Sequence, residues 1–233
     1  RKMKRKWIYL LAIIGASTLL ADGIITPAIT VTTAIEGLES ISPHLPVIPI
    51  TLGIITIIFF VQRFGTESIG KSFGVFMLIW FLLLGVTGAF SITSYPLILK
   101  AFNPYYAAML LAKSPQWFLI LGAVFLCTTG AEALYSDLGH CGRKNITISW
   151  VFVKAMLILN YLGQGAWVLN HVSMAPSVNP FFSIMPQNML IFSIIMATGA
   201  AIVASQALIS GTFSILSEAM NLHFWPRMRI KHP

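Results

Sequence analysis

The fold of this chain is decided by residues 7–38, which read WIYLLAIIGASTLLADGIITPAITVTTAIEGL. The stretch is apolar and longer than the 20 or so residues that cross a membrane as a helix. Before Glu36 its only charged residue is Asp22. A carboxylate at that depth costs roughly 3 kcal/mol even on the most lenient insertion scale, so such groups usually face a cavity, a partner or an ion. Asp22 is therefore a candidate functional residue.

The composition excludes a soluble domain. Of the 233 residues, 57% are hydrophobic and only 9% are charged, whereas soluble domains carry about 25% charged residues. The net charge of +8 does not indicate a nucleic-acid partner, because the basic residues lie between apolar stretches rather than on one soluble face. The two cysteines, Cys127 and Cys141, match neither a metal motif nor a disulfide framework. We expect an all-α, polytopic membrane protein in a lipid bilayer, without a cofactor.

Six apolar runs are candidates to cross the roughly 30 Å of hydrocarbon. They cover residues 7–38, 45–61, 73–94, 117–139, 146–169 and 189–220. With six crossings, twelve of the fifteen Lys and Arg residues fall on one side of the membrane and two on the other. The six runs predict a single transmembrane region, residues 1–233, and the positive-inside rule predicts that its N-terminus is cytoplasmic.

The first residue of the chain and the one basic residue inside an apolar run each lead to an expectation. The chain begins with Arg1 rather than Met, and its apolar pattern continues past Pro27. We therefore expect an excerpt from a longer protein rather than a signal peptide. Lys154 lies inside an apolar run, and we expect its long side chain to reach back to the basic side.

Two of the loops carry proline. Asn103 followed by Pro104 is typical of a helix start, because Asn caps the first turn and Pro suits its first position. A short helix is predicted there, on the outer surface. Residues 177–186, SVNPFFSIMP, are predicted to be irregular.

A polar stripe is predicted on the first helix. Asp22, Thr26 and Thr30 are spaced four residues apart and share one face. Pro27 lacks an N–H, which leaves the carbonyl of Gly23 without its helical partner. Carboxylate, hydroxyl and carbonyl oxygens of this kind replace the hydration shell of a cation. The alternative is structural: the threonines bond to their own helix, and Asp22 pairs with another helix.

A second polar group lies in residues 127–140, CTTGAEALYSDLGH. Thr129, Glu132 and Ser136 fall on one face, and the Thr-Thr-Gly sequence before Glu132 is a weak helix former. Interruptions of this kind mark the discontinuous helices that build ion sites near the membrane midplane. His140 is interpreted as an interface residue.

The remaining polar segments are interpreted as helix-packing segments. Residues 160–167, NYLGQGAW, combine two glycines with Gln164, and residues 205–211, SQALISG, follow the same pattern. Small residues let helices approach closely, and an amide can hydrogen-bond across the interface. No enzyme motif occurs, neither HExxH, GxSxG nor a P-loop, so we predict that the protein is not an enzyme.

Five strings together strongly resemble the KUP family of potassium uptake transporters, also called HAK/KUP/KT, and the resemblance runs in order through essentially the whole chain. They are ADGIITPAITVTTAIEGLE (21–39), TTGAEALYSDLGH (128–140), NYLGQGAW (160–167), NPFFSIMP (179–186) and SQALISGTFSI (205–215).

The resemblance implies a central fragment of a transporter of the APC superfamily, with a LeuT-type core of inverted repeats. The six helices would be its third to eighth spans. It also implies potassium uptake by secondary active transport, as a potassium:proton symport, across the plasma membrane or the bacterial inner membrane. The potassium-binding and coupling residues would be Asp22, Thr26, Thr30, Thr129 and Glu132. The protein partner that we consider is a second copy of the same chain, with which it would form a homodimer.

Two other readings remain open from the residues alone. An amino-acid transporter of the related superfamily would aim half-helix N-termini at a substrate carboxylate and place fewer acids in its cavity. A non-transporting scaffold would need no stripes of matched acids and hydroxyls, and a proton-channel subunit would show a lysine–acid relay along several spans. Only Lys154 is present for such a relay.

Overall fold

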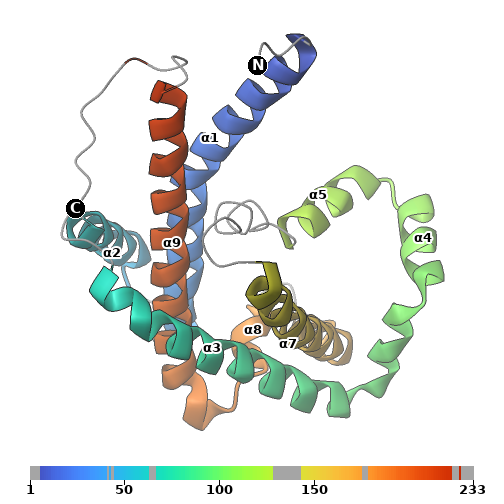
Figure 1. Cartoon of the computed structure of the whole chain (residues 1–233). Coiled ribbons are helices and arrows are strands. Elements are labelled where there is room, and N and C mark those ends of the chain that lie inside the picture. The colour runs from blue at the N-terminus through green and yellow to red at the C-terminus, as the bar shows by residue number, and fades with distance from the viewer. Residues whose placement is uncertain are drawn as a thin grey trace. The chain divides into compact units, whose positions relative to one another are not determined.

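A computed structural model of the chain describes residues 6–40, 42, 45–62, 67–127, 143–174, 178–221 and 226. Within these ranges all regular structure is helical (Figure 1). The α-helices are α1 (Lys6–Glu36), α2 (Val47–Gln62), α3 (Glu67–Ser94), α4 (Pro104–Lys113), α5 (Trp117–Cys127), α7 (Arg143–Asn170), α8 (Pro180–Ser183) and α9 (Leu190–Asn221). Short 3-10 turns η1 (Gly37–Ser40), η2 (Pro96–Phe102) and η4 (Gln187–Met189) stand between them.

Four segments in the described ranges are long and apolar enough to cross a membrane. They are Ile13–Glu36, Phe73–Ser94, Asn145–Asn170 and Gln187–Asn221. At 1.5 Å per residue, the shortest of them, 22 residues long, spans about 33 Å. The apolar parts of α2 and α5 are shorter, and the run that contains α5 continues into residues outside the described ones. The expectation of a polytopic, all-helical membrane protein is therefore confirmed, with four spans of sufficient length.

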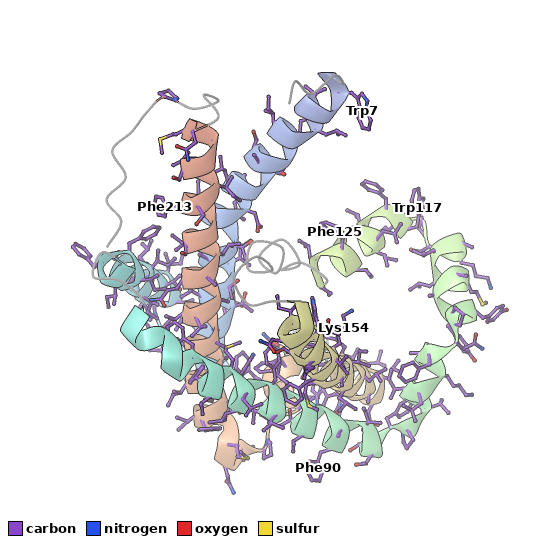
Figure 2. The ribbon with its side chains drawn as sticks, in the orientation of Figure 1. Trp7, Phe90, Trp117, Phe125, Lys154 and Phe213 are labelled. Carbon is purple, nitrogen blue, oxygen red and sulfur yellow. The ribbon has the colours of Figure 1, made fainter. Side chains whose placement is uncertain are left out.

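Large apolar side chains are exposed on the outside of the helices. Phe90 of α3 and Trp117 and Phe125 of α5 are exposed and project away from their helices (Figure 2). In water such a surface would drive aggregation, whereas in a bilayer it is the solvated surface. The distribution of apolar side chains thus agrees with the composition.

The chain divides into two compact units, one of residues 1–77 with 194–233 and one of residues 78–193. In the first unit α1 contacts α2, and its core includes Val31, Ile35 and Ile58. Gly23 of α1 lies against Thr212 of α9, where a Cβ on the glycine would be only 2.1 Å from the threonine Oγ1. The two long helices of this unit therefore meet at a glycine.

In the second unit, α3 and α7 also meet at glycines. A Cβ on Gly163 would lie 2.5 Å from the Cα of Gly88, which is backbone and cannot move aside. At the same crossing the Ser91 hydroxyl donates a hydrogen bond of 2.7 Å to the Gly163 carbonyl. The prediction that residues 160–167 pack helices closely is therefore confirmed at Gly163.

The loops follow local capping signals. The Asn103 side chain accepts a hydrogen bond of 3.0 Å from the backbone N–H of Tyr105 at the start of α4, so the short helix predicted there is confirmed. The prediction that residues 177–186 are irregular is wrong in part. Asn179 caps α8 through the N–H of Phe181, also at 3.0 Å, because Asn179 and Pro180 repeat the same start signal.

Candidate cation site

The structure brings Asp22 and Thr26 into direct contact on α1. The Thr26 hydroxyl donates a short hydrogen bond to Asp22 Oδ1. One turn further on, the Thr30 hydroxyl donates to the Thr26 carbonyl at 2.7 Å. The side chains of all three residues are half-buried. The predicted polar stripe therefore exists as a continuous chain of hydrogen bonds along one helix.

The stripe lies beside the buried face of α1. Gly23, Pro27 and Val31 are buried, whereas Ile25 and Ile29 are exposed on the other side. A carboxylate on the exposed face would meet lipid at a high cost. Asp22 instead lies at the margin of the face that packs inside its own unit.

No cationic side chain neutralises Asp22 within the described ranges, where its one recorded side-chain partner is the Thr26 hydroxyl. The structural alternative holds in part, because the Thr26 and Thr30 hydroxyls both bond within α1, whereas no pairing of Asp22 with another helix is found among the described residues. A buried charge without a protein counter-charge is expensive unless an ion or a proton balances it. The role of Asp22 as a cation ligand stays a prediction.

Pro27 adds a carbonyl oxygen to this level of the helix. It lies inside α1, and the helix continues through it without a break from Lys6 to Glu36. Because proline has no N–H, the carbonyl of Gly23 has no i+4 donor in its own helix. The carbonyl and the carboxylate of adjacent residues therefore offer oxygen atoms that the α1 hydrogen-bond ladder does not use.

The second predicted group of site residues lies outside the described residues. Thr129 and Glu132 fall between α5, which ends at Cys127, and α7, which begins at Arg143. The Cys127 carbonyl accepts a hydrogen bond of 3.1 Å from the Tyr161 hydroxyl of α7. This contact fixes the end of α5 against α7 just before the motif, and the roles of Thr129 and Glu132 stay predictions.

Sequence reasoning missed two groups of polar residues. Asn160 of α7 and Gln206 of α9 are 4% and 6% exposed, and their amide oxygens have no hydrogen-bond partner among the described residues. Buried polar atoms are rarely left unpaired, so these two amides are unusual for helices that only pack. Thr212 of α9 is the other omission, since it faces Gly23 but follows the segment interpreted as packing. The sequence feature that could have identified these residues is a single amide or hydroxyl side chain within an apolar run.

Comparisons with known proteins agree on one family. The profile of a family described as "K+ potassium transporter integral membrane domain" matches residues 1–233. The chain is 51% identical, over its whole length, to the probable potassium transport system protein Kup of Flavobacterium psychrophilum. It is 53% identical over 95% of its length to the protein of the same name from Cytophaga hutchinsonii. The probable Kup 1 protein of Lactococcus lactis subsp. lactis is 53% identical over 98% of the chain.

These relatives are longer proteins. The chain spans 36% of the Flavobacterium and Lactococcus proteins and 35% of the Cytophaga protein. Their names describe transport rather than an enzymatic reaction, in agreement with the lack of enzyme motifs in the sequence. No solved structure matches the chain.

Replacement of Asp22 by Asn tests whether the carboxylate is structural. Asn keeps the size and can still accept the hydrogen bond of Thr26, and no described cation would lose its partner. We expect the amount of protein in the membrane and its melting temperature in detergent to stay within error of the wild type. A structural ion pair would instead cost several kcal/mol when one partner is removed. A large loss of folded protein would therefore contradict the interpretation.

Proposed function

This chain belongs to the Kup family of potassium transporters, and from that premise we propose that it carries potassium ions across a membrane. The observation that carries the proposal is the contact between the Asp22 carboxylate and the Thr26 hydroxyl inside a membrane-length helix. A carboxylate supplies the charge that a bound cation needs, and a hydroxyl supplies a neutral ligand. The proposal extends to this chain what its relatives' names say of them.

The hydrogen bonds of the stripe favour cation binding. Thr26 uses its proton on Asp22, and Thr30 uses its proton on the Thr26 carbonyl. A hydroxyl has one proton and two lone pairs, so both oxygens retain lone pairs for a ligand. Potassium is held in proteins by such oxygens, which replace its hydration shell. Asp22, Thr26 and Thr30 are therefore the proposed potassium ligands on α1.

Proton coupling is the second part of the proposal. Thr129 would add a further potassium ligand, and Glu132 would carry the coupled proton. A carboxyl group in the inner half of a membrane span is poorly solvated, and desolvation disfavours its charged form. Such a group accepts a proton from one side and releases it to the other, which makes transport secondary active and a potassium:proton symport.

The membrane arrangement completes the proposal. We place α1, α2, α3, α7, α9 and the run that begins with α5 as six spans, the third to eighth of a LeuT-type inverted-repeat transporter. The asymmetry of the basic residues, twelve against two, supports a cytoplasmic N-terminus. The cell membrane, with a bacterial inner membrane as the specific case, is the proposed location. A homodimer is the proposed assembly, and no resident cofactor is invoked.

Potassium uptake by the complete gene product tests the proposal. Expressed in a strain without its own potassium uptake systems, the wild type should restore growth at limiting potassium. The Asp22→Asn variant should fail to restore it at an equal amount of protein in the membrane, because the charge that balances the ion is lost. Growth by both proteins, or by neither although both are in the membrane, would contradict the proposal.

Two further substitutions separate the proton from the potassium ion. Rubidium uptake into vesicles is measured at several external pH values. Glu132→Gln should remove the response to an imposed proton gradient while rubidium still binds. Thr129→Val should weaken the apparent affinity for rubidium and keep the proton response. If Glu132→Gln keeps the full pH dependence of the wild type, the proton is carried elsewhere, and Asp22 becomes the first residue to test.

A further inference from the structure

We propose that Thr212 of α9 supplies an additional oxygen ligand to the cation held by α1, opposite Gly23. The inference rests on the proposed function, since it adds one ligand from a second helix to the same ion. With Thr212, the part of the site that lies in the described residues would draw its oxygens from two helices of one compact unit rather than from α1 alone.

The contact is specific to the hydroxyl. The Cβ that any residue other than glycine would place at position 23 would lie 2.1 Å from Thr212 Oγ1, against 3.1 Å from its Cβ and 3.2 Å from its Cγ2. The oxygen is therefore the part of Thr212 nearest to the α1 backbone. Gly23 is buried, so the contact lies inside the unit. Glycine lets the backbone come this close, which is a common use of the residue beside a ligand.

The orientation of the Thr212 hydroxyl leaves it an acceptor. Its oxygen donates to the Leu208 carbonyl of the previous turn at 2.9 Å. With its single proton directed along α9, the lone pairs are what the oxygen can offer to α1. The arrangement repeats that of Thr26 and Thr30, whose protons are also used within their own helix.

Two acceptors of α1 belong to Gly23 itself and to the residue before it. The Gly23 carbonyl has no i+4 donor because Pro27 has no N–H, and Asp22 precedes Gly23 in the chain. A carboxylate, a carbonyl and a hydroxyl whose proton is already used cannot satisfy one another, because none has a hydrogen to donate. A cation is the partner that suits all three.

The rival interpretation is that Thr212 only fills space at the helix crossing. In that case its methyl group would matter and its oxygen would not. Thr212→Val keeps the shape and removes the oxygen, whereas Thr212→Ser keeps the oxygen and removes the methyl group. The two roles therefore predict opposite rankings of the same two variants.

The experiment measures rubidium uptake by the complete gene product and the rubidium-dependent rise in melting temperature of the purified protein. For Thr212→Val we expect the apparent KM and the dissociation constant for rubidium to rise about tenfold, as for the loss of one charge-assisted interaction. Thr212→Ser should stay within about twofold of the wild type. Thr198→Val is the matched control, because Thr198 is a half-buried threonine of α9 that donates to Ile194 at the same 2.9 Å.

A third variant, Thr212→Cys, gives a signature that packing cannot produce. A soft sulfur ligand favours a soft cation, so the affinity for thallium relative to potassium should rise. Should the valine variant fail to fold, this ratio still decides the matter. The inference is overturned if Val binds rubidium as the wild type does while Ser does not, or if the ratio for Cys is unchanged. A wild type that neither binds nor takes up rubidium would overturn the proposed function as well.

Discussion

The cost of an unpaired polar group in hydrocarbon governs this molecule. A bilayer offers no water to backbone N–H and C=O groups, so a chain that spans it must satisfy them internally. In the described residues, helices satisfy most of these groups. At the starts of α4 and α8, asparagine side chains accept hydrogen bonds from backbone N–H groups. Against this background, the few oxygens that the helices leave unused become informative.

Those oxygens gather at one level of α1. Pro27 releases the Gly23 carbonyl, Asp22 has no cationic side chain beside it among the described residues, and Thr26 spends its proton on the carboxylate. The missing N–H of Pro27 and the carboxylate in an apolar run would each destabilise a purely structural helix. In our account the remaining lone pairs of these oxygens bind a desolvated cation. Stability given up at one level of a helix is a common mark of a functional site.

Glycine has two uses in the fold. At Gly163 it allows α3 and α7 to touch backbone to backbone, and the Ser91 hydroxyl joins them. At Gly23, the residue after Asp22, it admits the Thr212 hydroxyl close to the α1 backbone. The first use is packing, whereas in our account the second also brings a ligand. The difference lies in what the glycine faces, which is backbone in one case and an oxygen with free lone pairs in the other.

Local signals made much of this predictable from sequence. The lengths of the apolar runs predict the helices. The four-residue spacing predicts the stripe of Asp22, Thr26 and Thr30, and an Asn-Pro pair predicts the start of α4. The same pair at Asn179 starts α8, but the proline-rich surroundings favoured an irregular loop. The contact of Gly23 with Thr212 could not be derived, because residues almost 190 positions apart meet only through the way the helices cross.

The most direct test of the account is to locate the ion. The complete gene product would be crystallised in rubidium, and anomalous scattering would mark the bound cations. The account predicts a peak within coordinating distance of the Asp22 carboxylate and the Thr26 hydroxyl, and its loss in Asp22→Asn. Rubidium bound elsewhere in the protein, with the stripe on α1 empty in the wild type, would contradict the central claim.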